Sequence, residues 1–234
     1  MVGPDTDRTS LTSFTGWEVR GGASAGPGAG DTRALSEAVP GRTVECYELL
    51  AVTGRGFGPP RFLTIAEESE ESEESEGSEG AQRDPVGDRR GAGSDALPDL
   101  SGFRRPWSLL YRRIVETGPQ EVAPFAIYLL GVNPPAGAGD DDLEEFDDFY
   151  TNVHLPEVAE RRHALRAVRY ELEREVKPPY RGAPRFLAIY EMDEARASRR
   201  RHTGPPYSKG PEVWQGHKTP WRLWYRLLAR IPTR

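Results

Sequence analysis

The sequence has almost no cysteine and no long apolar run. Among 234 residues there is one cysteine, Cys46, which cannot form an intramolecular disulfide or a cysteine-based zinc site. No stretch approaches the roughly 18 apolar residues of a transmembrane helix. The first ten residues have neither the basic nor the apolar region of a secretory signal. These absences predict a protein of the reducing cytoplasm.

The common signatures of nucleotide and metal sites are also missing. No phosphate-binding loop, dinucleotide-binding glycine pattern or Gly-x-Ser-x-Gly element is present. His163, His202 and His217 are scattered, and their spacing from His154 fits no compact zinc site. The acidic run 140–148 spreads around the polar side of a helix, which favours a solvated face over a metal cluster. We therefore expect no metal and no cofactor, with haem ligation by His154 as an alternative.

The negative charge is concentrated in one segment. Eight of the glutamates lie in 67–79, and removing their charge from the formal net charge of −6 leaves +2. A nearly neutral body disfavours nucleic acid as a partner. The arginine run 199–201 and the Arg- and Trp-rich C-terminal segment would suit nucleic acid or a membrane surface. The second of these segments, however, repeats 106–115 and belongs to the fold, so we expect neither partner.

Three blocks of sequence occur twice in the same order. Segment 45–49 recurs at 168–172, segment 60–67 at 184–191 and segment 106–112 at 220–226, with offsets of 123, 124 and 114. We predict two copies of one unit, 11–118 and 121–232, after a disordered N-terminus, 1–10. The Glu/Ser-rich insert 68–100 has few apolar residues to bury and is expected to be disordered.

Each copy reads as strand, helix, strand, connection and strand. Segments 125–130, 184–191 and 220–226 are rich in β-forming residues. Leu143, Phe146, Tyr150 and Val153 recur at helical spacing behind three aspartates, and a shorter helix is expected at 32–38. This order is the split βαβ plan. The predicted fold class is α+β, with two tandem ferredoxin-like (βαββ-type) units forming one intramolecular α+β barrel.

The second copy also carries a family resemblance. Segments 149–158, 169–172 and 184–193 resemble EthD-like proteins of the dimeric α+β barrel superfamily, over about 120–230. The resemblance implies a barrel of two ferredoxin-like units, here fused in one chain. The superfamily includes cofactor-free monooxygenases, polyketide cyclases, isomerases, dehydratases, haem enzymes and small-molecule sensors. EthD-like proteins often accompany degradative or natural-product pathways.

His154 is the strongest catalytic candidate. An imidazole can act as a general acid or base near neutral pH, and His154 matches the histidine of the family pattern. Tyr150 lies four residues earlier, and Glu157 three residues later could orient the ring. The first copy has Asp31 at the equivalent offset, so we expect a single site. The alternative is a histidine that only caps carbonyls or binds a carboxylate.

Four further side chains are candidates for substrate binding. Arg169 could hold a substrate carboxylate or phenolate, or instead form a salt bridge within the fold. The aromatic candidates are Tyr128, Tyr190 and Trp221, which would line the barrel cavity if they face inward and fill a helix–sheet core if they do not.

The predicted function is acid–base tailoring of an aromatic or polyketide-like small molecule in the barrel cavity, by cyclisation, dehydration or isomerisation. A non-catalytic module that binds a ligand or partner is one alternative, and a cofactor-free monooxygenase is another. A homodimer is left open.

Overall fold

The computed structural model describes residues 10–19, 43–52, 59–67, 103–118, 123–179, 182–198 and 206–232. The predicted helix 32–38, the predicted disordered insert 68–100 and all but residue 10 of the predicted disordered N-terminus, 1–10, lie outside the described residues.

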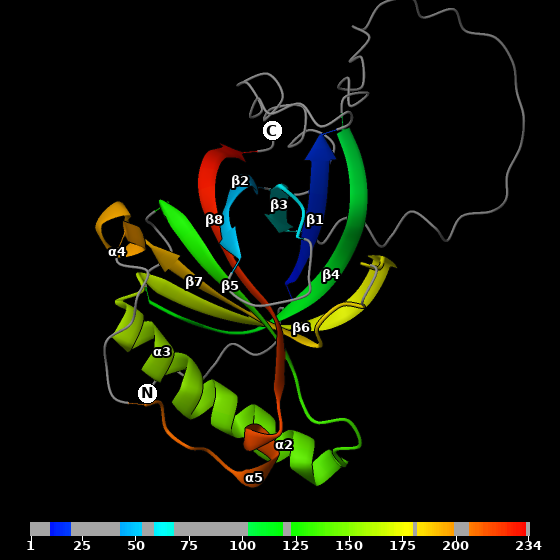
Figure 1. The fold of residues 1–234 in the computed structure, drawn as a ribbon, viewed down its shortest axis with the longest axis vertical. Helices are drawn as coiled ribbons and strands as arrows, with labels where there is room; N and C mark the ends of the chain where they lie inside the picture. Colours follow the sequence, from blue (N-terminus) through cyan, green and yellow to red (C-terminus); the bar gives the residue numbers. More distant parts are fainter. Residues whose placement is uncertain are drawn as a thin grey trace, which may run out of the picture.

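Eight antiparallel strands form a closed barrel in the order β1-β3-β2-β8-β5-β7-β6-β4. Every predicted strand lies within or overlaps one of them. The fold class predicted from the sequence, an intramolecular α+β barrel, is confirmed (Figure 1). The strands are β1 Leu11–Val19, β2 Thr43–Val52, β3 Phe62–Glu67, β4 Phe103–Thr117, β5 Ala126–Asn133, β6 Arg166–Lys177, β7 Phe186–Met192 and β8 Lys218–Pro232.

The barrel consists of two halves with the same strand order. The first half runs β4-β1-β3-β2 and the second runs β8-β5-β7-β6. Two seams join them, β2 with β8 and β4 with β6. The exact boundaries of the two predicted copies stay a prediction.

Matching tyrosines tie each half to the other. Tyr111 of the first half donates a hydrogen bond to the carbonyl oxygen of Pro184 at 2.7 Å. Tyr225 of the second half donates to the carbonyl oxygen of Pro60 at 3.1 Å. Both hydroxyls are buried, and burial raises the pKa of both tyrosines, so both remain hydrogen-bond donors. The two bonds are therefore reciprocal contacts across the barrel.

Two glycines allow a second pair of matching contacts. A Cβ atom on Gly16 would lie 2.7 Å from neighbouring ring atoms, and one on Gly131 would lie 2.6 Å from a proline ring. Each glycine therefore makes room for a tryptophan and a proline. These neighbours are Trp107 and Pro60 for Gly16, and Trp221 and Pro184 for Gly131. The two tryptophans meet inside the barrel, with ring centroids 5.5 Å apart.

Apolar side chains fill most of the barrel interior. Ile127 and Leu129 of β5 point inward, whereas Tyr128 and Leu130 belong to a separate cluster on the outer face. This alternation is the period of two expected of a strand. The sheet therefore has a packed inner face and a second apolar face outside.

A long helical segment covers the outer face of the second half (Figure 1). It comprises α2 (Asp140–Phe149), a π-helical turn η3 (Tyr150–His154) and α3 (Leu155–Arg162). Phe146, Tyr150 and Leu155 are completely buried against the sheet. The connection from β7 to β8 adds two short helices, α4 (Glu194–Ser198) and α5 (Glu212–Gln215). Among the described residues, no helix is both long and apolar enough to cross a membrane.

Candidate active site

A cavity of about 260 Å³ lies between the helical segment and the outer face of β5 and β8. We call it the helix–sheet pocket. The segment around α5 forms one of its walls. Its lining is Tyr128, Leu130, Val132, Tyr150, His154, Val158, Arg162, Tyr207, Trp214, His217, Thr219 and Arg222.

The helix–sheet pocket is outside the barrel, whereas the sequence led us to expect the site in the barrel cavity. Inside the barrel, large side chains occupy the space beneath this part of the sheet. Trp221 is one of them, packed against Trp107, so the sheet separates it from His154. Trp221 therefore does not line the same site as His154, because strand alternation places it on the opposite face.

His154 lies in the π-helical turn and enters an aromatic cluster. Its ring centroid is 4.5 Å from that of Trp214, 5.5 Å from Tyr207 and 5.6 Å from Tyr150. Among the described residues, the buried Nδ1 atom of His154 has no hydrogen-bond partner. Single π-helical turns inside α-helices are frequent at functional sites. A buried nitrogen without a partner in a cavity is a position that a ligand can satisfy.

Burial keeps His154 uncharged. Burial, with smaller contributions from nearby His217 and Arg161, lowers the pKa of the imidazole to about 4, although Glu157 acts in the opposite direction. At neutral pH the ring is therefore neutral and offers one unprotonated nitrogen. His217 also stacks on the Trp214 ring, with the two ring centroids 4.2 Å apart.

Glu157 binds the wall of the pocket. Its carboxylate accepts hydrogen bonds from Arg161 at 2.5 Å and from the backbone N–H of Ser208 at 3.0 Å. The Arg161 guanidinium lies over the Tyr207 ring, 4.7 Å from its centroid. Among the described contacts, no hydrogen bond joins Glu157 to His154. The position of Glu157 is that of an anchor for the segment that carries Tyr207, and its influence on His154 is electrostatic.

Two of the predicted tyrosines bring hydroxyl groups to this region. The hydroxyls of Tyr150 and Tyr190 are buried, and neither has a hydrogen-bond partner among the described residues. Burial raises the pKa of both tyrosines, so both stay protonated and can donate. Tyr150 lines the pocket, and Tyr190 lies on the same outer sheet face beside Tyr128, with ring centroids 6.3 Å apart.

Arg162 is a pocket residue that the sequence analysis missed. Its guanidinium lies 4.1 Å from the centroid of Tyr128, which in turn stacks on Trp224. Among the described residues, its Nε atom has no hydrogen-bond partner. The residue spacing could have identified it. Val158 lies four residues after His154 and Arg162 lies eight residues after it, so all three share one face of a helix.

Arg169 is completely buried but does not line the pocket. It donates hydrogen bonds to Asp147 and Thr151, both at 2.6 Å. Its guanidinium lies between the rings of Tyr150 and Phe186, 4.5 Å and 4.4 Å from their centroids. This geometry matches the alternative of an internal salt bridge, which fastens the helical segment to β6.

The pocket combines the neutral imidazole of His154 with cations. Its described lining contains Arg162 and Arg222 but no aspartate or glutamate. Among the described residues, no three His, Cys, Asp or Glu side chains form a group suited to a metal ion. Such a cavity suits an aromatic ligand with a hydroxyl group that can lose its proton.

No protein-family model and no curated protein matches the chain. The chain is similar to the solved structure of a chlorite dismutase-like protein, with 11% identity and a TM-score of 0.42, covering 95% of this chain and 96% of that one. It is also similar to an anthrone oxidase-like protein, with 10% identity and a TM-score of 0.47, covering 96% of this chain and 94% of that one. Likenesses this distant support no conclusion about function.

Proposed function

We propose that the protein is a small-molecule enzyme that performs acid–base chemistry on an aromatic or polyketide-like compound in the helix–sheet pocket. The observation that carries the proposal is the buried, unpartnered Nδ1 atom of His154 in an aromatic cavity whose described lining has cations and no carboxylates. A cavity of about 260 Å³ is just below the range of about 300–1,000 Å³ for pockets that hold drug-sized ligands. A ligand of one or two rings is therefore expected.

The proposed chemistry is proton removal from an enolisable position or a phenol. Neutral His154 accepts the proton, and Arg162 stabilises the oxyanion that results. The Tyr150 hydroxyl donates a hydrogen bond to the same oxygen. Because the pKa of the imidazole is low, His154 readily returns the proton to another ligand atom. Cyclisation, dehydration and isomerisation all use this sequence of transfers.

The EthD-like assignment, the fusion of two units and a place in natural-product metabolism form part of this proposal, as does a cytoplasmic location. An oxygenation without cofactor would begin with the same phenolate. The second candidate is a binding protein without catalysis. It is favoured by the low pKa of His154, which makes the imidazole a weak base at neutral pH.

The test uses 2-tetralone, a two-ring ketone with acidic hydrogens next to the carbonyl, in deuterated buffer. Proton NMR measures the rate at which these hydrogens exchange. We expect the wild type to accelerate exchange and His154→Phe to lose about 100-fold or more of the acceleration, the usual contribution of a general base. His163→Asn is the matched control, because His163 is exposed and ends the helix with φ 52°, a conformation that asparagine tolerates.

The two candidate functions differ in this assay. Saturable binding of 2-tetralone without accelerated exchange would favour the binding protein. Acceleration that survives in His154→Phe would show that His154 is not the base.

A further inference from the structure

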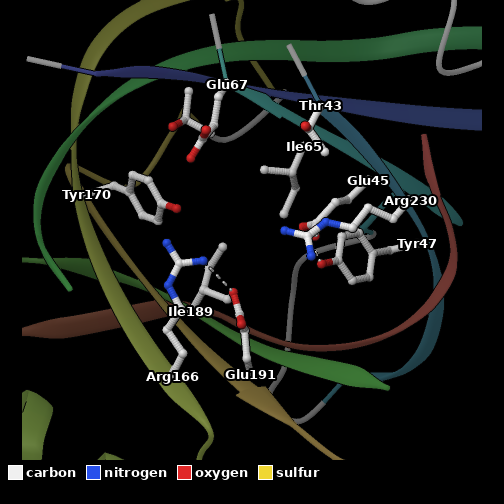
Figure 2. A pocket seen from close by; sticks show the side chains of 11 residues that line it. Thr43, Glu45, Tyr47, Ile65, Glu67, Arg166, Tyr170, Ile189, Glu191 and Arg230 are labelled. Carbon is white, nitrogen blue, oxygen red and sulfur yellow. Dashed lines mark hydrogen bonds and ion pairs between the residues drawn. The ribbon is translucent and has the colours of Figure 1, made fainter. Parts of the chain in front are cut away.

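A second cavity lies inside one end of the barrel, where β1, β2 and β6 begin and β3, β7 and β8 end (Figure 2). We call it the barrel mouth. Its volume is about 130 Å³, roughly ten times what one water molecule needs. Its lining is Thr12, Thr43, Glu45, Tyr47, Ile65, Glu67, Arg166, Tyr170, Ile189, Glu191 and Arg230. The wall of the sheet separates it from the helix–sheet pocket, because neighbouring residues of β7 point to opposite faces.

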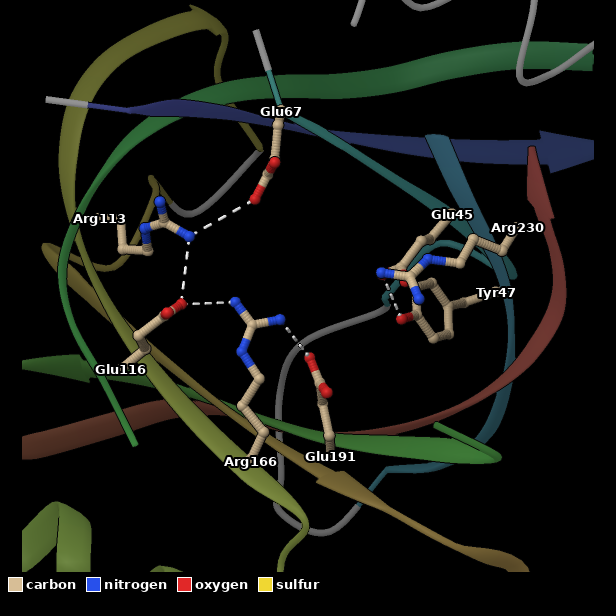
Figure 3. Close-up of polar contacts among 8 residues, drawn as sticks. All are labelled: Glu45, Tyr47, Glu67, Arg113, Glu116, Arg166, Glu191 and Arg230. Atoms are coloured by element: carbon tan, nitrogen blue, oxygen red, sulfur yellow. Dashed lines mark hydrogen bonds and ion pairs between the residues drawn. The ribbon is translucent and has the colours of Figure 1, made fainter. Parts of the chain in front are cut away.

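The charged groups on one side of the mouth form a chain of ion pairs (Figure 3). Arg113 contacts Glu67 at 3.5 Å and Glu116 at 3.1 Å. Arg166 contacts Glu116 at 2.6 Å and Glu191 at 3.3 Å. Arg166 is thus held closest by Glu116, outside the cavity, and Glu191 receives the longer contact.

A separate pair lies on the other side of the mouth. Arg230 contacts Glu45 at 3.2 Å, and the hydroxyl of Tyr47 donates to the same carboxylate at 2.7 Å. The positive charge of Arg230 and the negative charge of Glu45 balance each other. Among the described residues, Arg230 forms its ion pair with Glu45 and none with Glu191.

The charges of the mouth do not balance. Its described lining contains three carboxylates and two guanidiniums, and the neighbouring Arg113 and Glu116 cancel each other, which leaves one negative charge. Glu191 has the most buried of the three carboxylates, with its side chain 10% exposed, and its one ion pair among the described residues is 3.3 Å long. Burial raises its pKa to about 7, although Arg166 lowers it.

Tyr170 supplies an independent sign of a ligand. The residue is 7% exposed, and among the described residues its hydroxyl has no hydrogen-bond partner. Figure 2 shows its side chain pointing into the mouth beside Arg166. The hydroxyl is open to the cavity, where a polar group of a ligand can reach it.

We propose that the barrel mouth is a second ligand site, which binds a small primary ammonium ion with a short apolar group. The ammonium donates hydrogen bonds to the carboxylate of Glu191 and to the hydroxyl oxygen of Tyr170. Ile65 and Ile189 receive the apolar part. One positive charge balances the mouth, whereas an anion would meet three carboxylates. The described residues form no cluster that would chelate a metal ion, so an organic cation is the better match.

The test is calorimetric titration of the full chain with propylammonium chloride at pH 8, where Glu191 is mostly ionised. We expect saturable binding by the wild type, at least tenfold weaker binding by Glu191→Gln and several-fold weaker binding by Tyr170→Phe. Both replacements keep the size of the side chain. The matched control is Glu173→Gln, which removes a half-exposed carboxylate of β6 and should bind as the wild type does.

Several outcomes would overturn the proposal. The first is the absence of saturable binding of propylammonium. The second is equal binding by the wild type and Glu191→Gln, which is expected if the cation binds to the Glu/Ser tract instead. Tighter binding of propionate, the anion of matched size, would reverse the assigned charge. A urea-unfolding transition for each variant shows that the fold is retained. Binding that is unchanged in His154→Phe separates this site from the helix–sheet pocket.

Discussion

Replacing the carboxylate of Glu191 should change how the stability of the barrel depends on pH. The pKa of Glu191 rises from 4.5 to about 7 on folding, mainly because the group is buried. Between these two values the folded state binds more protons than the unfolded state. The free energy of unfolding of the wild type therefore falls as pH rises from about 4.5 to 7, and this penalty persists at higher pH.

The size of the effect follows from the difference between the two pKa values. A difference of about 2.5, at about 1.36 kcal/mol for each pKa unit, corresponds to about 3 kcal/mol. Four charged groups from four strands act on Glu191. Arg166 and Arg230 lower its pKa, and Glu45 and Glu116 raise it. The amide introduced by Glu191→Gln would be neutral at every pH and would escape the penalty.

The assay is urea unfolding of the wild type and Glu191→Gln from pH 5 to pH 8.5, since urea adds no cation that could occupy the barrel mouth. The difference in unfolding free energy should shift by up to about 3 kcal/mol in favour of the variant as pH rises. Glu173→Gln should show no such trend. A difference that is constant across this range would refute the buried, poorly compensated carboxylate on which the reasoning depends.

Three other predictions concern the helix–sheet pocket and the contacts between the halves. The pKa of His154 falls from 6.5 to about 4 on folding, so the unfolded state binds more protons between these values. The unfolding free energy of the wild type should therefore fall by about 3 kcal/mol relative to that of His154→Phe between pH 7 and pH 4. An NMR titration midpoint of His154 near 6.5 would contradict this. Tyr111→Phe and Tyr225→Phe should each lower the unfolding free energy by about 1–2 kcal/mol, because each leaves a buried carbonyl unpaired, and a double mutant should be additive. Gly131→Ala should cost about 1–3 kcal/mol in thermal unfolding, because the added methyl group would crowd its neighbours. Gly139 has no such neighbour nearer than 4.0 Å, so Gly139→Ala should cost only about 0.5 kcal/mol, for the loss of a favourable N-cap residue of α2; equal costs would refute the crowding.

The strands were predictable because the chain contains their pattern twice. Segments 184–191 and 220–226 lie at β7 and β8 because β-forming residues between Pro and charged residues mark a strand locally. The helix was predicted only to about Val153 but continues to Arg162. Pro156 lies in the first turn of α3, directly after the π-helical turn, where its missing N–H is tolerated. The π-helical turn before it leaves no signal in residue spacing.

The candidate site was predictable only along the helix. Tyr150 and His154 are four residues apart, and the structure brings them into one pocket. The facing strands were harder, because a shift of one residue reverses the face of a side chain. Tyr128 accordingly lies with His154 and Trp221 does not. Trp214 comes from an irregular connection without periodicity.

The barrel mouth could not be read from the sequence at all. Its charged residues come from many strands, and each was visible only as the polar end of a strand. Glu67 and Glu191 even occupy matching positions of the repeated block 60–67 and 184–191. Closure of the barrel is what turns these strand ends toward one another.

The reciprocal contacts between the halves also bear on how the two sides can diverge. In a barrel assembled from two identical chains, any substitution appears on both sides of the twofold axis. Here Tyr111 and Tyr225, or Gly16 and Gly131, are encoded separately, so either member can change alone. One half can then keep the shared packing while the other changes, and the sequence has His154 in the second half and Asp31 at the equivalent offset in the first. Because both halves lie in one chain, the sequence of either half can change without breaking the symmetry that the packing retains.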